Sequence, residues 1–335
     1  MNILITGGCG FIGSHLVRLI LEKGHEVVNL DKLTYAGNLE NLRDCEKNSG
    51  YRFVKGDIAD RETVFPLVED AELIINLAAE THVDRSLDSA DVFLKTNLFG
   101  VYAICNAIKN SGKKIRLLQV STDEVYGSIE HGAFKETDRF SPTSPYSASK
   151  AGAELMAFSF HHAHGLDVVS TRGANTYGPN QFPEKLIPFF ATELFEGRKV
   201  PLYGDGKNVR DWLHVLDHAR AIYEIAMKGE SGKAYNIPGL NERQNIDVVR
   251  KILKSFGKGE ESIQYVKDRA GHDRRYAVEG KRLESIFEFE RVSFEKGLAE
   301  TVAWYKNNEK WWRPLKKESE DFFKRHYSKL SSNER

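Results

Sequence analysis

Cysteine and proline are scarce in this chain, and neither sign of charge is in excess. Its 335 residues include three cysteines and nine prolines, and 48 basic residues balance 48 acidic ones. Cys9, Cys45 and Cys105 form no CxxC pair, which excludes a disulfide framework or a zinc ribbon and favours reduced thiols in a cytoplasmic protein. A net charge of zero offers no general attraction for nucleic acid or for an anionic membrane. We therefore expect neither as a partner.

Long apolar runs are also lacking. The longest, such as residues 73–79, are far shorter than the roughly 20 residues that a membrane helix needs. The first apolar segment, residues 2–6, is interrupted by glycines at once, so we expect no signal peptide. Apolar residues still make up 41% of the chain, which is enough for a buried core. The sequence thus predicts a folded cytoplasmic protein of about two domains.

The first half of the chain alternates short apolar runs with helical patterns. Strands are predicted at residues 3–6, 26–30, 51–55, 73–77, 115–121 and 167–171, and helices at 11–23, 61–68, 88–110 and 144–164. This alternation is typical of a Rossmann-type α/β fold, a doubly wound parallel sheet covered on both faces. After Gly178, prolines and turns interrupt the pattern. We expect residues 1–175 to form the Rossmann domain and 176–335 mainly a smaller α/β lobe, with some chain crossing back. Residues 306–335 are expected to end the chain as a helix.

A glycine-rich turn follows the first predicted strand. Gly8, Gly10 and Gly13 form GxGxxG, and Gly7, Gly10 and Gly13 form the GxxGxxG variant, directly before a predicted helix. Glycines here permit a tight turn and the close approach of a pyrophosphate to free N–H groups at the helix start. Asp31 ends the second strand about 20 residues later, where a carboxylate binds ribose hydroxyls and repels a 2′-phosphate. We predict a site that favours NAD over NADP; Lys32 weakens this preference slightly.

Two other strand ends are expected to contact the same cofactor. Asp57 and Ile58 follow the third strand, where a side chain can reach the adenine. Leu77, Ala78 and Ala79 follow the fourth, and the small alanines let the backbone run beside the cofactor. Ligands of open α/β sheets bind at the carboxyl ends of the strands, where these segments lie.

Tyr146 and Lys150 stand four residues apart at the start of predicted helix 144–164. This spacing places the phenol and the ammonium group on one helical face. A nearby cation lowers the pKa of tyrosine from about 10 toward neutrality, so a tyrosinate could take the proton of a sugar hydroxyl while hydride leaves to NAD. The same YxxxK spacing begins at Tyr51, in a strand pattern, and at Tyr203, across a glycine turn, so neither is expected to be catalytic.

Three consecutive polar residues, Thr122, Asp123 and Glu124, follow another predicted strand at the same edge. Thr122 could share a hydrogen bond with the reacting hydroxyl. Asp123 and Glu124 are paired carboxyl groups, and an environment that separates their pKa values lets one donate a proton and the other accept one. The histidines at 161, 162 and 164 have no carboxylate or cysteine at ligand spacing, so no metal site is expected.

These motifs resemble the extended short-chain dehydrogenase/reductases, and within them the nucleotide-sugar 4,6-dehydratases. The resemblance runs from Ile3 to about Tyr276. Its motifs include GGCGFIGSH (7–15), DKLTYAGNL (31–39), NLAAETHVDRS (76–86), STDEVYG (121–127), SPYSASKAGAE (144–154), YGPNQFPEKLIP (177–188), PLYGDGKNVRDWLHVLDH (201–218) and RAGHDRRYA (269–277).

The resemblance implies a lyase that converts dTDP-glucose, or a related nucleotide hexose, to the 4-keto-6-deoxy sugar. The implied steps are oxidation at C4, loss of water across C5–C6, and reduction at C6, with NAD tightly bound throughout. Tyr146 would deprotonate the C4 hydroxyl, Glu124 would remove the C5 proton, and Asp123 would protonate the departing C6 hydroxyl. A homodimer is implied through helices 88–110 and 144–164.

The resemblance also implies the contact residues. Those for NAD are Gly7, Gly10, Phe11, Ile12, Gly13, Asp31, Lys32, Thr34, Asp57, Ile58, Leu77, Ala78, Ala79, Thr96, Tyr146, Lys150 and Thr176. Those for the nucleotide-diphosphate sugar are Thr81, His82, Asn175, Lys185, Leu186, Pro201, Tyr203, Arg210, Asn245, Arg269 and His272.

The sequence departs from the family pattern at one place near the site. The family usually has Cys-Ser-Asn-Asn before the tyrosine found here at 177, and this chain has Gly173-Ala174-Asn175-Thr176. We expect the reaction class to be kept while the sugar or the nucleotide can differ. Two alternatives stay open. One is a nucleotide-sugar 4-epimerase or uronate decarboxylase, which needs no acid/base pair for elimination. The other is a non-catalytic NAD-binding protein, whose signature would be a missing tyrosine, lysine or glycine.

Overall fold

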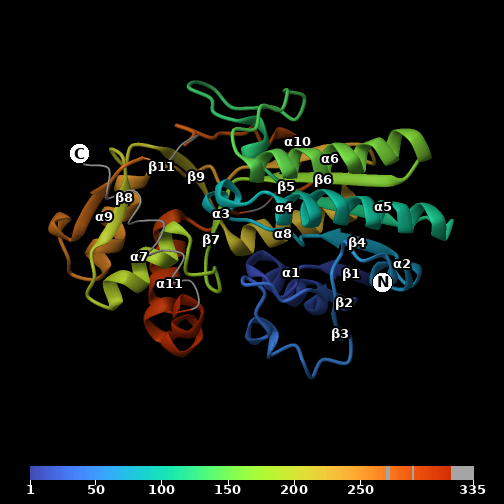
Figure 1. The fold of residues 1–335 in the computed structure, drawn as a ribbon, viewed down its shortest axis with the longest axis horizontal. Helices are drawn as coiled ribbons and strands as arrows, with labels where there is room; N and C mark the ends of the chain where they lie inside the picture. Colours follow the sequence, from blue (N-terminus) through green and yellow to red (C-terminus); the bar gives the residue numbers. More distant parts are fainter. Residues whose placement is uncertain (269–271, 289, 318–335) are drawn as a thin grey trace.

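Seven parallel strands form the central sheet of the computed structural model, which describes residues 1–268, 272–288 and 290–317 (Figure 1). In spatial order they are β10 (Ala234–Ile237), β6 (Asp167–Gly173), β5 (Arg116–Thr122), β4 (Leu73–Asn76), β1 (Asn2–Thr6), β2 (Glu26–Asp31) and β3 (Tyr51–Lys55). The order reverses between β1 and β4, which is where an open α/β sheet offers a crevice at its carboxyl edge. The expected Rossmann-type sheet is confirmed.

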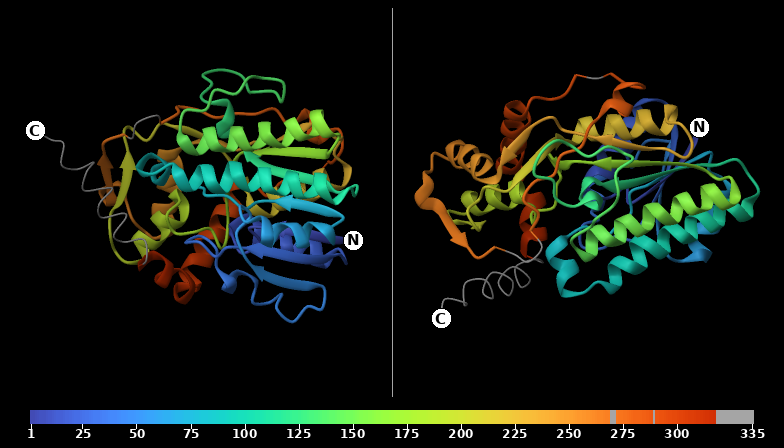
Figure 2. Two further views of the ribbon diagram at one scale, coloured as in Figure 1. Left: turned by 45° about the vertical axis from the view of Figure 1, so that its right-hand side comes forward. Right: turned by 90° about the horizontal axis from the view of Figure 1, so that it is seen from above.

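Helices cover both faces of this sheet (Figure 2). One face carries α1 (Phe11–Glu22) and α8 (Val215–Lys228); the other carries α2 (Arg61–Glu69), α5 (Gly100–Ser111) and α6 (Pro145–His164). Side chains of β1 alternate between the two cores: Ile3 and Ile5 pack in the core under α1 and α8, whereas Leu4 packs in the other. Both faces are therefore buried, as the apolar strand sequences predict.

The second half of the chain builds a lobe at the carboxyl edge of the sheet (Figure 1). Its strands and helices are β7 (Asn175–Tyr177), β9 (Val209–His214) and β11 (Glu242–Gln244) in one sheet, β8 (Val200–Tyr203) and β12 (Ile263–Val266) in another, and α7 (Leu186–Phe195), α9 (Asn245–Ser255) and α11 (Phe294–Asn307). Phe189, Trp212 and Phe294 lie in its core. The chain also returns to the first domain: α8 packs on the main sheet, β10 is one of its strands, and α10 (Lys281–Glu284) packs against β10.

The helix expected at 88–110 is interrupted, and that expectation is corrected. A short helix α3 (Val83–Asp88) ends at Ser89, which has extended backbone angles, and α4 (Asp91–Phe93) continues through a π-helical turn, Leu94–Phe99, into α5. The buried side chain of Asn97 in this turn accepts a hydrogen bond from Glu80 N at 2.9 Å and donates one to Ser149 Oγ at 2.8 Å. These contacts tie the loop after β4 to α6, and π turns of this kind are frequent at functional sites.

The rest of the described chain consists of short turns and a C-terminal extension. Single 3₁₀ turns occupy Leu39–Leu42, Asp123–Tyr126 and Glu260–Ser262. Residues 309–317 are helical after α11, and the remainder of the expected terminal helix, 318–335, lies outside the described residues. Across the described residues, no helix is long and apolar enough to cross a membrane. The three cysteine thiols are buried and unbridged.

A buried ion pair joins α6 to β6 behind the carboxyl edge of the sheet. Arg172 donates to Glu154 Oε1 from Nε at 2.9 Å and from Nη2 at 2.6 Å, and both residues are almost completely withdrawn from water. Arg172 also lies over the rings of Tyr126 and Phe140, which flank the 123–126 turn. The pair thus holds that turn against α6.

Replacing Arg172 by leucine should lower the free energy of unfolding by about 3–5 kcal/mol, because Glu154 would be left buried without a counter-charge. Urea unfolding measures the change, and the double variant R172L/E154L should recover part of it. Arg43→Ala, which removes an exposed pair with Glu40, is the control and should cost less than about 1 kcal/mol. An equal, small loss in both single variants would contradict the assignment.

Candidate active site

A cavity lies at the carboxyl edge of the main sheet, against the second lobe. Every residue expected to contact NAD and all five expected catalytic residues line it. They come from the ends of strands β1 to β5, from β7, from the start of α1, from the π turn and from α6. The structure therefore brings together groups that are up to 169 positions apart in the chain, from Gly7 to Thr176.

The glycine-rich turn at one end of the cavity has no room for side chains. Gly7 has φ +75°, and a Cβ there would lie 2.7 Å from Ala78 N. A Cβ on Gly13 would lie 2.2 Å from Gly7 O. No side chain caps the N-terminus of α1, where Gly10 is the N-cap residue, so the first N–H groups of the helix are free to bind an anion. This geometry fits a pyrophosphate.

Asp31 and Lys32 mark the part of the cavity expected to hold the adenosine. Asp31 accepts hydrogen bonds from Cys9 N at 2.9 Å and from Leu33 N at 2.8 Å, which fixes its carboxylate at the end of β2. Burial raises the pKa of Asp31. Lys32 forms an ion pair with Asp57 at 2.8 Å, so its charge is already compensated. This arrangement favours ribose hydroxyls over a 2′-phosphate, in line with a site for NAD.

The paired acids lie in different surroundings. Asp123 is 2% exposed, and burial, followed by the charges of Glu124 and Asp211, raises its pKa well above the usual range. Its Oδ2 is buried and has no hydrogen-bond partner among the described residues. Glu124 is half-buried. Burial therefore favours the protonated form of Asp123, which suits the acid of an acid–base pair.

Tyr146 and Lys150 both face the cavity from α6, but their electrostatics differ from the expectation. The pKa of Tyr146 is raised rather than lowered, by burial and then by the charges of Glu124 and Asp123; a hydrogen bond with Thr122 opposes this. Lys150 donates to Val120 O at 2.7 Å, and burial lowers its pKa to about 8. The expectation that the pKa of the phenol is lowered beside Lys150 is wrong for the protein without its cofactor, because burial and then two carboxyl groups raise it.

The expected substrate residues fall into two groups. Thr81, Asn175 and Lys185 line the same cavity, where Lys185 donates to Thr81 O at 3.1 Å and Asn175 Oδ1 is buried without a partner among the described residues. His82 and Leu186 lie next to these, at the start of α3 and α7. A deeper group lies in the second lobe and consists of Pro201, Tyr203, Arg210, Asn245 and His272. Arg269 falls outside the described residues.

The deeper group is nevertheless electrostatically linked to the paired acids. Arg210 donates to Asp273 O at 2.9 Å, stacks on the Tyr276 ring at 4.4 Å, and exerts a lowering influence on the pKa of Asp123. The rings of Tyr203 and His272 pack edge to face, with centroids 6.0 Å apart. A guanidinium and two aromatic groups of this kind suit a nucleotide diphosphate.

Sequence reasoning missed two residues at this site. Tyr276 donates to Asp273 Oδ2 at 2.5 Å, and burial and the charge of Glu124 raise its pKa. His218 lines the cavity, and its Nδ1 lies 2.7 Å from Thr176 Oγ1; burial lowers its pKa to about 4. Both residues belong to motifs quoted above, but the spacing of the residues in those motifs does not predict that the two side chains lie near the paired acids and the cavity. No cluster of metal-binding side chains occurs among the described residues.

The buried ammonium of Lys150 should make stability depend on pH. Because its pKa is lowered to about 8 on folding, the unfolded chain binds more protons above pH 8, and this contribution to stability rises with pH. Relative to Lys150→Met, the wild-type protein should gain about 2 kcal/mol of unfolding free energy between pH 7 and pH 9.5. Urea unfolding of both proteins across this range measures the difference. A flat difference would show that Lys150 keeps its ordinary pKa.

Comparison with known proteins identifies the family. The family model described as GDP-mannose 4,6 dehydratase matches residues 4–301. The dTDP-glucose 4,6-dehydratase of Streptomyces niveus is 46% identical over 327 residues, which cover 96% of this chain and 97% of that protein.

Solved structures agree with this. The dTDP-glucose 4,6-dehydratase DesIV of Streptomyces venezuelae, solved with NAD bound, superposes with a TM-score of 0.92 at 45% identity, covering 94% of this chain and 100% of that one. The UDP-glucose 4-epimerase of Thermus thermophilus, also in complex with NAD, gives 0.85 at 30% identity, covering 92% and 100%. The chain described here belongs to the GDP-mannose 4,6-dehydratase family of the extended short-chain dehydrogenase/reductases.

Proposed function

We propose that this protein is an NAD-dependent nucleotide-sugar 4,6-dehydratase, a lyase that acts on dTDP-glucose or a closely related nucleotide hexose. The observation that carries the proposal is the pair Asp123 and Glu124 in the same cavity as Tyr146 and Lys150, where burial favours the protonated form of Asp123. An elimination across C5–C6 needs both an acid and a base, whereas epimerisation at C4 does not. The names of the similar enzymes support the same reaction.

The residues present fit NAD. The glycine turn would offer N–H groups to the pyrophosphate, Asp31 would bind the ribose hydroxyls, and Leu77, Ala78 and Ala79 after β4 would also contact the cofactor. When bound, NAD supplies a hydride acceptor for C4, a hydride donor for C6, and a positive charge near Tyr146. That charge, added to the ammonium of Lys150, would offset the two carboxyl groups that raise the pKa of the phenol.

Three side chains of the protein each carry out a different proton transfer. Tyr146, aided by Thr122, takes the proton of the C4 hydroxyl. Glu124 removes the C5 proton, which the 4-keto group has made acidic. Asp123 holds its proton because of burial and delivers it to the departing C6 hydroxyl.

Substrate contacts come mainly from the second lobe. We propose that residues 176–335 bind the nucleotide sugar and that residues 1–175 bind NAD. Thr81, His82, Asn175, Lys185 and Leu186 would surround the sugar and diphosphate, and Pro201, Tyr203, Arg210, Asn245, Arg269 and His272 the nucleotide end. We place the specificity of the enzyme in Gly173–Thr176, which lines the cavity and differs from the family pattern. A cytoplasmic location is part of the proposal and is supported by the buried, unbridged thiols.

A homodimer through the helices at 91–111 and α6 completes the proposal. Phe99 and Leu155 are 61% and 59% exposed on neighbouring helices, an apolar exposure that association would remove.

The double variant Phe99→Glu/Leu155→Glu should therefore be monomeric in light scattering, whereas the wild-type protein is dimeric. Leu240→Glu, at an equally exposed position in the β10–β11 loop, is the control and should leave the dimer intact. A wild-type monomer, or a dimer that survives both substitutions, would contradict the proposal.

Mass spectrometry after incubation with NAD and a panel of nucleotide sugars tests the reaction itself. We expect the loss of one water from dTDP-glucose or from another nucleotide hexose. Glu124→Gln should lower this turnover at least about 100-fold and stop the exchange of solvent deuterium into C5, because the base is lost. The exposed Glu130→Gln is the control and should act like the wild type.

An unchanged mass with an isomeric product, insensitive to Glu124→Gln, would support a 4-epimerase instead. That second candidate is favoured by the similarity to the Thermus enzyme. Loss of carbon dioxide from a nucleotide uronate would indicate a decarboxylase, and NAD binding without any product a non-catalytic protein.

A further inference from the structure

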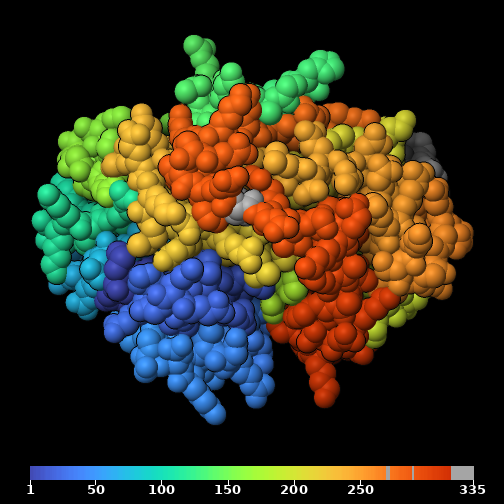
Figure 3. Space-filling view, turned by 180° about the vertical axis from the view of Figure 1, so that it is seen from behind, coloured from blue at the N-terminus to red at the C-terminus, as the bar shows by residue number. Residues whose placement is uncertain are grey.

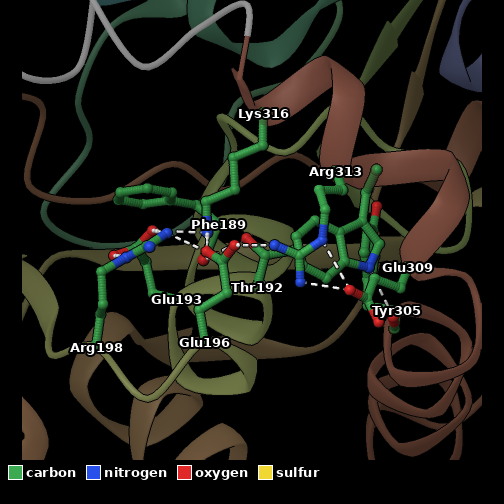
Figure 4. A network of polar contacts seen from close by, with 10 residues as sticks. Phe189, Thr192, Glu193, Glu196, Arg198, Tyr305, Glu309, Arg313 and Lys316 are labelled. Atoms are coloured by element: carbon green, nitrogen blue, oxygen red, sulfur yellow. Dashed lines mark hydrogen bonds and ion pairs between the residues drawn. The ribbon is translucent and has the colours of Figure 1, made fainter.

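The C-terminal residues 309–317 are anchored on the second lobe by buried polar contacts (Figure 4). Lys316 is 4% exposed, and its Nζ lies 2.7 Å from both Glu193 Oε1 and Glu196 Oε2 on α7. Arg313 reaches Glu196 from the same side. The Trp312 side chain is completely buried and donates from Nε1 to Tyr305 O at 2.8 Å. These contacts hold the segment in one place.

From this anchored position the segment reaches the first domain at Asn41. Figure 3 shows the blue N-terminal part and the red part of the chain on the same face of the molecule. Trp311 Nε1 donates to Asn41 Oδ1 at 2.9 Å. Asn180, at the start of the second lobe, donates to the same oxygen from Nδ2 at 3.2 Å. Asn41 is 1% exposed, so these donors are its partners in a water-free environment.

The Asn41 side chain also forms a hydrogen bond with the dinucleotide turn. Its Nδ2 donates to Cys9 O at 2.9 Å, and Cys9 is the residue between Gly8 and Gly10. The same carbonyl accepts from Asn38 N at 3.0 Å, and Cys9 N donates to Asp31 Oδ2 at 2.9 Å. The turn is therefore held on both sides of Cys9, next to the free N–H groups of α1.

The orientation of the Asn41 carboxamide is the decisive point. A carboxamide can present its oxygen or its NH₂ group on either side. Donors from Trp311 and Asn180 require the oxygen on their side, and this turns the NH₂ group toward Cys9 O. The Cys9 carbonyl, which can only accept, requires the same orientation, so the docked C-terminal segment reinforces the arrangement that holds the turn.

We infer that Trp311 and Asn41 are positioning residues for the dinucleotide turn, so that docking of the C-terminal segment strengthens the binding of NAD. This inference rests on the proposed use of NAD but not on the sugar chemistry. Neither side chain lines the cavity, so both act through the backbone of the turn.

Release of NAD from the purified holoenzyme after dilution, together with the Kd of NAD, tests the inference. Trp311→Phe keeps an aromatic ring but removes the donor, and it should weaken NAD binding about 3-fold to 10-fold, the value of one buried hydrogen bond. Asn41→Ala should weaken it more. The double variant should be no weaker than Asn41→Ala alone, because Trp311 acts through Asn41.

Trp304→Phe is the matched control. The Trp304 ring packs edge to face on Trp311, with centroids 4.9 Å apart, so this variant perturbs the same aromatic cluster and leaves the donor to Asn41 in place. It should bind NAD like the wild type, even where its melting temperature falls. Equal NAD affinity in Trp311→Phe and wild type, equal losses in Trp311→Phe and Trp304→Phe, or additive losses in the double variant would each overturn the inference.

The outcome is separable from that of the proposed function. A wild-type protein that binds NAD but releases no water from any sugar nucleotide would refute the dehydratase and leave this coupling testable by the same binding assay. A wild-type protein that binds no NAD would refute both.

Discussion

Withdrawal of ionisable groups from water is the constraint on which the active site depends. Asp123, Tyr146 and Lys150 are buried in one cavity, and the pKa of each moves in the direction that favours its uncharged form. Burial favours the protonated form of Asp123, which suits a group that donates a proton in an elimination. Burial and the nearby carboxyl groups disfavour ionisation of the Tyr146 phenol, and positive charge brought into the cavity would oppose them.

The fold contributes a rigid background for these groups. The Arg172–Glu154 pair fixes the 123–126 turn from behind, and Asn97 ties the loop after β4 to the helix that carries Tyr146. The charges of Arg172 and Glu154 thus compensate each other behind the cavity, and those of Lys32 and Asp57 do so at its wall. Such pairs avoid the cost of a buried charge without a partner.

The departure at Gly173–Thr176 also has a physical explanation. A Cβ at Gly173 would lie 2.5 Å from the His218 ring, so glycine leaves room for that imidazole at the cavity wall. Thr176, where the family usually has asparagine, pairs its hydroxyl with His218 Nδ1. Gly173 and Thr176 therefore both accommodate His218 at the cavity wall: the glycine leaves room for its ring, and the threonine hydroxyl pairs with its Nδ1.

The sequence by itself determined the parallel α/β fold and the dinucleotide turn. Both follow from local rules: the strand period, the need for glycine where no Cβ fits, and the spacing of a helical turn. Other residues at the cavity, such as Thr34, Thr96 and Thr176, were expected only because the chain resembles the dehydratases. Only the tertiary structure decided the direction of the Tyr146 pKa, the interruption before Asp91, the two-part substrate region, and the roles of Tyr276, His218 and Trp311. Each of these depends on side chains brought together from distant parts of the chain, such as Asn41 and Trp311. The spacing of residues along the sequence does not predict such contacts.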